Sequence, residues 1–238
     1  MAEAKYKQIF NIIKKRIKDG TYQNGKAIPD QNALANEFNA SRMTVKKALD
    51  MLSYEGFLYS KRGSGTYVRQ NAADQRDTLP FNEYAGLTKE LGEKIESQVV
   101  KFDVVFPTKT LQDQLKVKST DPIYEIKRLR IVEGEPYVFE HTFLSARLVP
   151  GLNENILHHS LYEYIQKDLK LKIGSAFRRI SAEKTNEDDL KYLKSKKNDP
   201  ILQIQQTVYL ENGEPLEFST NRHPYNGKHA YTILDMKK

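Results

Sequence analysis

Two arginines stand two positions apart in a stretch of the chain that is otherwise rich in apolar residues. Arg128 and Arg130 lie between Ile126 and Val132. In a β-strand this spacing puts both guanidinium groups on the same face of the sheet. Two buried and unpaired cations would cost much free energy, so on a covered face each arginine should meet a carboxylate or an anionic ligand group.

Glu140 is the nearest carboxylate that could pair with these arginines. A hairpin loop of three residues, 133–135, would place Glu140 directly opposite Arg128. A loop of two residues would instead turn Glu140 to the other face of the sheet. The alternative is a strand face open to solvent, on which the two arginines need no partner.

A second set of residues could bind nucleic acid. Ser41 is suited to cap the N-terminus of a helix. Basic and polar side chains fill the first turns of that helix, namely Arg42, Met43, Thr44, Lys46 and Lys47. Farther along, two strand-like stretches enclose a basic turn with glycines, made of Lys61, Arg62, Gly63, Ser64 and Gly65. Such a turn is narrow enough to approach the minor groove of DNA.

The excess positive charge of the chain is confined to this first part. The net charge is +7, and residues 1–70 hold 13 Lys and Arg against 6 Asp and Glu. Residues 71–238 hold 25 of each sign. This asymmetry indicates a nucleic-acid-binding domain at 1–70 joined to a neutral body. The polar stretch 71–80, which ends in a proline, is the expected linker, and the body comprises 81–238.

Composition excludes several classes of site. The 238 residues include no cysteine, which excludes disulfides, thiolate zinc sites and cysteine nucleophiles. No apolar run approaches the ~20 residues of a membrane-spanning helix. The first residues also lack the apolar stretch of a secretory signal. We therefore expect a cytoplasmic protein that does not bind membranes.

Three helices and a hairpin are needed to position the basic residues of the first domain. An apolar stripe at helical spacing runs through Lys5–Lys18. A second helix is expected after Pro29, with Asp30 as a possible N-cap, and a third follows Ser41 and ends at Gly56. Two helices joined by a short turn and followed by a basic hairpin indicate a helix-turn-helix with a wing.

The body contains an internal repeat. Residues 115–123 resemble residues 193–201, and each copy is followed by a strand pattern, an acidic turn with glycine and a second strand pattern. Helical segments at 109–116 and 187–194 precede these hairpins, and a further helix is expected at 161–168. Two similar helix–hairpin units predict one antiparallel sheet with helices packed against it, which is an α+β fold.

Residues 6–68 resemble the winged helix-turn-helix of GntR-family bacterial repressors. The likeness is clearest in the sequences SRMTVKKAL, EG and RGSGT. It implies that Arg42 and Thr44 contact DNA from the recognition helix and that Gly63 and Gly65 form the tip of the wing.

Two positions depart from the usual GntR pattern. Lys46 stands where the family commonly has arginine, which favours a phosphate contact over bidentate recognition of guanine. The segment Pro29–Asn32 reads Pro-Asp-Gln-Asn, where the family usually has Pro-Ser-Glu-Arg. The usual arginine contact is therefore missing at Asn32, and Asp30 would repel a nearby phosphate. We expect a different operator or weaker half-site binding.

From about residue 81 to its end, the chain resembles the UTRA effector-binding domain of the HutC subgroup, whose fold is similar to that of chorismate lyase. The stretches that carry the likeness are 127–130, 135–140, 160–162 and 215–217. The resemblance implies that Arg128 and Arg130 hold an anionic group, and that Glu140 and Glu217 accept hydrogen bonds from hydroxyls. The remaining implied effector contacts are Ser160, Tyr162 and His223.

Two stretches of the body are less similar to that domain. Segment Pro80–Leu87 lacks the Ser/Thr cluster that assists phosphate binding in sugar-phosphate members. Residues 225–231 replace a stretch that usually contains Arg-x-Asp. A carboxylate could therefore occupy the arginine pair in place of a phosphate.

An enzyme similar to chorismate lyase and a DNA-binding protein without an effector are the alternatives. The sequence has no nucleophile elbow, no phosphate-binding glycine loop and no paired metal-ligand spacing. We therefore expect no catalysis, no metal and no cofactor. The expected protein is a homodimeric repressor, released from a palindromic double-stranded operator by a small anionic effector, foremost a sugar phosphate.

Overall fold

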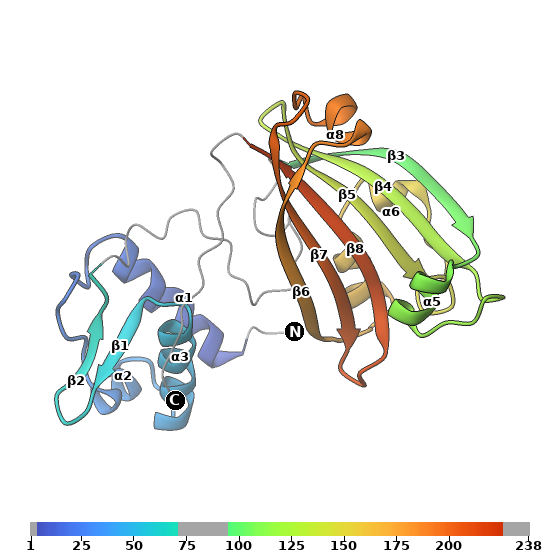
Figure 1. Ribbon diagram of the computed structural model, residues 1–238. Helices are drawn as coiled ribbons and strands as arrows, with labels where there is room; N and C mark the ends of the chain where they lie inside the picture. Colours follow the sequence, from blue (N-terminus) through green and yellow to red (C-terminus); the bar gives the residue numbers. More distant parts are fainter. Residues whose placement is uncertain (1–3, 71–94, 226–238) are drawn as a thin grey trace. The chain divides into compact units, whose positions relative to one another are not determined.

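The computed structural model describes residues 4–70 and 95–225, and each of these parts is a compact unit with its own core (Figure 1). The expected linker, 71–80, the segment Pro80–Leu87 and all of 225–231 except its first residue lie outside the described residues. Among the helices of the described parts, none combines the length and the apolar character needed to cross a membrane.

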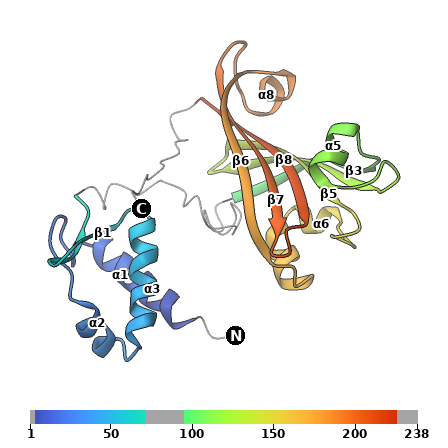
Figure 2. The ribbon, with the colours of Figure 1, turned by 60° about the horizontal axis from the view of Figure 1, so that its bottom comes forward.

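The first unit contains three helices and a short hairpin (Figure 2). Its elements are α1 (Lys5–Lys18), α2 (Gln31–Glu37), α3 (Arg42–Tyr54), β1 (Leu58–Lys61) and β2 (Gly65–Val68). The strands β1 and β2 pair antiparallel, and the apolar side chains of the helices and strands share one core. The helix-turn-helix with a wing that the sequence predicted is thus confirmed.

Both N-terminal caps that the sequence indicated are present. The Asp30 carboxylate accepts hydrogen bonds from the backbone N–H groups of Asn32, at 2.7 Å, and Ala33, at 2.9 Å. Ser41 Oγ accepts the backbone N–H of Thr44 at 3.2 Å. These bonds satisfy donors that would otherwise be unpaired at a helix start, so side chains fix where α2 and α3 begin.

The second unit is built on one six-stranded antiparallel sheet, with the strand order β3-β4-β5-β8-β7-β6. The strands are β3 (Ile95–Val105), β4 (Ile123–Val132), β5 (Glu135–Ser145), β6 (Ile173–Lys184), β7 (Pro200–Leu210) and β8 (Pro215–Pro224). The two repeated hairpins, β4–β5 and β7–β8, meet in the middle, where β5 pairs with β8. The α+β fold is confirmed, and the sequence did not indicate the edge strands β3 and β6.

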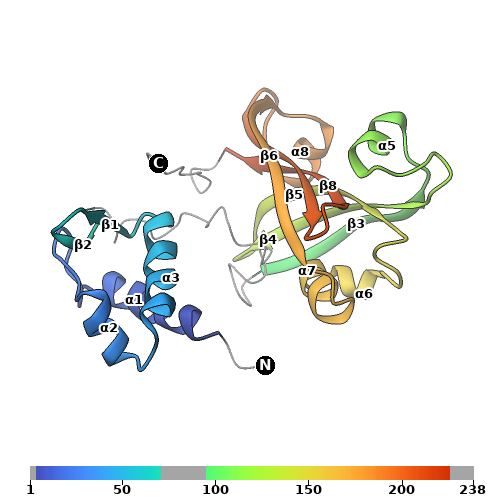
Figure 3. The ribbon, with the colours of Figure 1, turned by 90° about the horizontal axis from the view of Figure 1, so that it is seen from below.

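Helices cover both faces of this sheet (Figure 3). One face packs against α5 (Lys109–Leu115) and α8 (Glu187–Tyr192). The other face, here called the covered site face, packs against α6 (Glu154–Leu157), α7 (Leu161–Glu163) and the π-helical segment η2 (Tyr164–Asp168). The elements α7 and η2 take the place of the single helix expected at 161–168.

The β4–β5 hairpin differs from the sequence expectation in an informative way. Its turn has two residues, Glu133 and Gly134, and both have positive φ, at 53° and 79°. A two-residue turn was expected to turn Glu140 away from Arg128, but this expectation is wrong. An extra residue, Tyr137, bulges out of β5 and shifts the register by one, so Arg128 pairs directly with Glu140.

Candidate functional site

The first turns of α3 present the predicted DNA contacts to solvent. Arg42, Met43, Lys46 and Lys47 are exposed and Thr44 is partly exposed. Met43 exposes 74% of its surface, which is high for a large apolar side chain. The apolar side chains on the opposite side of α3 are fully buried. Core packing therefore fixes which side of the helix faces outward.

Two of these basic side chains also have contacts within the protein. Lys46 Nζ lies 3.7 Å from the carboxylate of Asp50. Lys47 Nζ lies 3.9 Å from the centre of the Tyr6 ring. An exposed ion pair contributes only about 0–1 kcal/mol and an exposed cation–π contact about 0.5–1 kcal/mol. Either lysine could therefore leave its contact and bind a DNA phosphate at little cost in free energy.

The turn between β1 and β2 presents the predicted wing residues. Lys61, Arg62, Gly63 and Gly65 are all exposed. Gly63 and Gly65 have φ values of +74° and +123°, and an added Cβ would touch nothing within 4 Å at either position. These glycines are therefore needed for the backbone conformation and not for space.

Asp30 places a fixed negative charge beside the start of the recognition helix. The backbone N–H groups of Ala33 and Asn32, and then the charge of Arg42, hold the pKa of the Asp30 carboxyl below its usual value. The carboxylate stays ionised at neutral pH and partly offsets the potential of Arg42. The expectation that operator recognition differs from the usual family pattern stays a prediction.

Some basic residues of this unit stabilise the fold instead. Lys14 Nζ contacts the Glu55 carboxylate at 2.7 Å and lies 5.0 Å from the centre of the Phe57 ring. Arg16 contacts Glu37 at 2.5 Å. These bonds tie α1 to the end of α3 and to α2, so the two cations are already engaged.

In the second unit, Arg128 and Glu140 form a buried ion pair on the covered site face. They expose only 6% and 9% of their surfaces, and Arg128 Nη2 lies 2.7 Å from Glu140 Oε2. Arg128 Nη1 also donates a hydrogen bond to the Leu157 carbonyl at 3.1 Å. The pair thus links β4 and β5 to the end of α6. Arg128 Nε has no hydrogen-bond partner within the described residues.

Arg130 lies on the same face, two positions along β4, and is 2% exposed. Burial lowers the pKa of Arg130, the charge of Glu140 raises it, and the charge of Arg128 lowers it further. The environment therefore disfavours this positive charge. An anionic group bound beside the two arginines would offset that cost.

Glu217 is the second buried carboxylate of this face, and donors surround it. Tyr162 Oη donates to Glu217 Oε2 at 2.8 Å. Gln206 Nε2 and Ser219 Oγ donate to Oε1 at 3.1 Å and 2.6 Å. Burial, together with the negative charge of Glu217, raises the pKa of Tyr162 well above its usual value. Tyr162 is thus a neutral hydroxyl donor at physiological pH.

The sequence reasoning missed three residues of this network. Gln206 and Ser219 are buried, and Arg178 on β6 donates from Nε to Gln206 Oε1 at 2.9 Å. Gln206 stands beside Gln205 in a glutamine-rich strand, where composition does not tell which glutamine faces the core. Only the cross-strand register, with Gln206 between Arg178 and Ser219, assigns them to the covered site face.

Two further predicted effector residues have partners of their own. Ser160 caps α7, because its Oγ accepts the backbone N–H of Glu163 at 3.2 Å. His223 is 3% exposed and shares a face of β8 with Glu217, and its ring centre lies 6.3 Å from that of Tyr137. The structure thus places Ser160 at a helix start and His223 at the bulge that sets the β4–β5 register.

The covered site face carries a surplus of positive charge. Three arginines, Arg128, Arg130 and Arg178, share it with two carboxylates, Glu140 and Glu217. Four of these five side chains are buried, and Arg178, which is only partly buried, supplies the excess positive charge at the β6 edge. A ligand with one negative charge would balance the set, whereas a neutral or cationic ligand would not.

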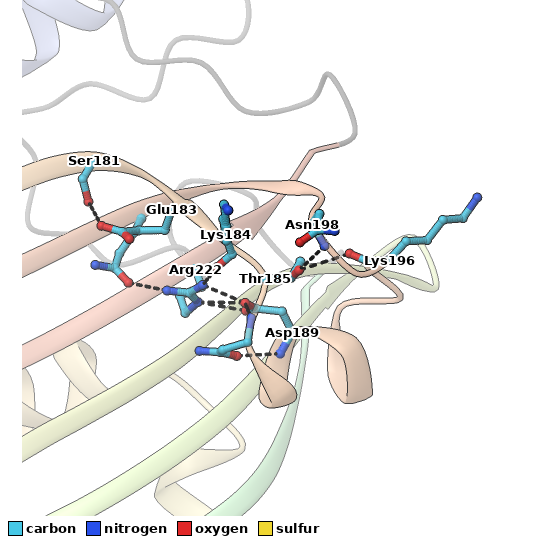
Figure 4. A network of polar contacts seen from close by, with 10 residues as sticks. Ser181, Glu183, Lys184, Thr185, Asp189, Lys196, Asn198 and Arg222 are labelled. Atoms are coloured by element: carbon cyan, nitrogen blue, oxygen red, sulfur yellow. Dashed lines mark hydrogen bonds and ion pairs between the residues drawn. The ribbon is translucent and has the colours of Figure 1, made fainter.

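The opposite face of β8 anchors α8 (Figure 4). Arg222 donates to both carboxylate oxygens of Asp189, at 2.9 Å from Nε and 2.7 Å from Nη2, and Asp189 is fully buried. Arg222 Nη2 also donates to the Lys184 carbonyl at 2.8 Å. Since Glu217 and His223 point to the other face, β8 connects the candidate effector site to α8.

Comparison with known protein families matches both units. The pattern described as "Bacterial regulatory proteins, gntR family" matches residues 5–68, and that of the "UTRA domain" matches residues 90–227. The second match alone covers more than half of the chain.

The chain is similar over nearly its whole length to bacterial regulators. It is 42% identical over 236 residues to the HTH-type transcriptional regulator GmuR of Bacillus subtilis, covering 98% of this chain and 99% of the relative. It is 30% identical to the mannosyl-D-glycerate transport/metabolism system repressor MngR of Escherichia coli, covering 98% and 96%. The crystal structure of the possible transcriptional regulator YydK of B. subtilis superposes with a TM-score of 0.83 at 27% identity, covering 98% and 100%.

Proposed function

Since the chain belongs to the GntR family of bacterial regulatory proteins and carries a UTRA domain, we propose that this transcriptional regulator is a homodimeric repressor, released from a palindromic operator by a small anionic effector. In this proposal residues 1–70 bind DNA, 71–80 form the linker, and 81–238 bind the effector and dimerise. The protein acts in the cytoplasm, where the operator is.

The two arginines buried side by side on the covered site face carry the effector part of the proposal. Arg128 and Arg130 are both buried, and Glu140 lies directly opposite Arg128. A sugar phosphate supplies negative charge that the two arginines can bind and brings hydroxyls that can donate to the carboxylates. The relative MngR, by name, serves a mannosyl-D-glycerate system, which supports a sugar-derived anion.

The exposed basic residues of α3 and of the wing support the proposal that the protein binds operator DNA. Each copy of α3 would lie in a major groove, with residues 61–65 in the adjacent minor groove. Two-fold symmetry of a dimer demands an operator with matching symmetry. Effector binding would favour an arrangement of the bodies that holds the two DNA-binding domains at the wrong separation. A coupling of ~1–3 kcal/mol is enough to weaken binding roughly 5–150-fold.

Footprinting of the full-length protein tests this function. The DNA upstream of its own gene serves as the probe, with a scrambled duplex of the same length as the control. We expect protection of two half-sites related by two-fold symmetry, and loss of protection when a sugar phosphate that binds the protein is added. Protection of a single asymmetric site, or none on any duplex, would contradict the proposal.

The proposal includes no catalytic activity. The enzymatic alternative rests on the similarity of the UTRA fold to chorismate lyase, and a shared fold does not fix function. Incubation of the purified chain with chorismate should give no product, and clear turnover would contradict this part of the proposal.

A further inference from the structure

The start of the recognition helix carries a large apolar side chain that the fold does not use. Met43 exposes 74% of its surface, whereas Tyr54, Ile12 and Tyr59 expose 56%, 41% and 38%. Among the large apolar side chains that the structure describes in the first unit, Met43 is therefore the most exposed. It is also not part of the core of that unit. Core packing thus gains little from this side chain.

Met43 lies in the middle of the outward side of α3. The buried side of this helix is formed by Val45, Ala48, Leu49 and Leu52. Met43 precedes Val45 by two residues, and at 3.6 residues per turn this places it about 160° away around the helix axis. Its side chain therefore points away from the core.

The cap of α3 keeps the neighbouring threonine close to the helix start. Thr44 Oγ1 lies 2.8 Å from Ser41 Oγ, which also accepts the Thr44 backbone N–H at 3.2 Å. Met43 makes no such contact, and with the exposed Arg42 it forms the outer part of the first turn. In a helix-turn-helix, the first residues of the recognition helix contact base edges. Met43 is therefore positioned to meet a base.

Basic side chains around Met43 restrict the kind of partner. Arg42, Lys46 and Lys47 are all exposed on the same two turns of α3. A second copy of this surface would bring like charges together, whereas a polyanion would be attracted. The favoured partner is thus a polyanion, and opposite Met43 an apolar group of that partner gives the largest gain.

The major groove of DNA offers one apolar group that differs between bases. Thymine carries a C5-methyl group there, whereas the other distinguishing groups are hydrogen-bond donors and acceptors. A methionine side chain has no donor and only a weak acceptor, and its unbranched chain adapts to irregular surfaces. Contact with a thymine methyl is therefore the base-specific interaction that suits Met43.

We propose that Met43 recognises a thymine in each half-site of the operator by packing against its C5-methyl group. This proposal rests on the proposed function, because it requires α3 to lie in the major groove. It makes Met43 a specificity-determining residue, with a base chemistry different from that of the neighbouring Arg42.

The test uses the duplex that the full-length protein protects in footprinting. Each thymine of the half-sites is replaced in turn, at both symmetry-related positions, by deoxyuridine, which lacks only the methyl group. Fluorescence anisotropy then measures the affinity of wild type, Met43→Ala and Ile12→Ala for every duplex. Ile12→Ala is the matched control, because Ile12 is an exposed apolar residue of α1 in the same unit. Urea unfolding shows whether both variants are folded.

We expect at least one thymine position at which deoxyuridine weakens wild-type binding about 16-fold, or about fourfold for each of the two methyl groups. Ile12→Ala should show the same loss. Met43→Ala should bind the thymine duplex more weakly than wild type does, and deoxyuridine at that position should not weaken its binding further.

Three results would overturn the methyl contact. These are a wild type that is insensitive to deoxyuridine at every position, a Met43→Ala variant that keeps the wild-type sensitivity, and an Ile12→Ala variant that loses it. Failure of the wild type to bind any duplex would instead reject the proposed function, and the methyl contact with it.

Discussion

The arginines and carboxylates of the covered site face show how far single residues can be interpreted from sequence. The spacing of Arg128 and Arg130 was enough to predict a shared face, because strand alternation depends only on the chain. Their partner could not be fixed in advance, because the bulge at Tyr137 changes the register without any distinctive residue. Gln206 was missed because a neutral amide gives no charge signal that separates a buried position from an exposed one.

Removing one member of the buried pair Arg128 and Glu140 should lower the free energy of unfolding strongly, whereas replacing both with apolar residues should lower it little. Arg128→Met leaves the Glu140 carboxylate buried without its partner, and we expect a loss of about 3–5 kcal/mol in the free energy of unfolding. Replacing both with Met should recover most of that loss. Urea unfolding of the two single variants and the double variant measures the coupling. If the loss in the double variant equalled the sum of the losses in the two single variants, the two side chains would not interact.

Tyr162 should make stability depend on pH in the alkaline range. Its pKa is raised above the usual value of 10.0, so the native state holds this proton more tightly than the unfolded state does. The stabilisation that the native state gains from the protonated Tyr162 hydroxyl is therefore complete below pH 10.0. It is lost as pH rises toward the raised pKa. Below that range Tyr162→Phe should cost about 1–3 kcal/mol, because Glu217 loses a donor.

Urea unfolding of wild type and Tyr162→Phe across alkaline pH measures this effect. The difference in free energy of unfolding between the two proteins should shrink as pH rises above about 10. A difference that stays constant, or grows, would contradict the environment assigned to Tyr162.

At the level of elements, the first unit was the most predictable part of the molecule. Helix starts depend on short-range chemistry, and Asp30 and Ser41 cap their helices as the sequence indicated. The edge strands β3 and β6 were not indicated, because both are partly exposed along their length and lack a clear apolar alternation. The π-helical segment η2 was also missed, since no residue type specifies such a turn.

Substitutions in the recognition helix should distinguish side chains that contact bases from side chains that contact phosphates. Arg42→Ala should weaken operator binding by about 1–3 kcal/mol and relax sequence preference, as expected for a side chain at base edges. Lys47→Ala should weaken binding to all duplexes alike and reduce the slope of log affinity against log salt by about 1. Lys109→Ala is the control, because this exposed lysine lies on α5 of the second unit.

Fluorescence anisotropy with operator and scrambled duplexes at several salt concentrations distinguishes these roles. The assignment would fail if Arg42→Ala kept full sequence preference, or if Lys109→Ala weakened binding as much as Lys47→Ala.

For the whole molecule, the uneven charge was the most useful sequence signal. Residues 1–70 carry the whole net charge of +7, and the family match at 5–68 falls within the same part of the chain. The neutral part, in turn, contains the UTRA match. Charge distribution is visible in a sequence because it needs no register or packing. The arrangement of the polar side chains on the covered site face could not be predicted, because it depends on pairing between strands far apart in the chain.

In the proposed function, one unit binds operator DNA and the other releases it when an anion binds. The direct test is to measure the operator affinity of the full-length protein with and without a phosphorylated sugar that binds it. Three proteins are compared: the wild type, Arg42→Ala, and the double variant in which Met replaces both Arg128 and Glu140. We expect the sugar to weaken wild-type binding about 5–150-fold. Arg42→Ala should bind poorly throughout, and the double variant should bind DNA normally and ignore the sugar. Normal release of the double variant by the sugar would contradict the account.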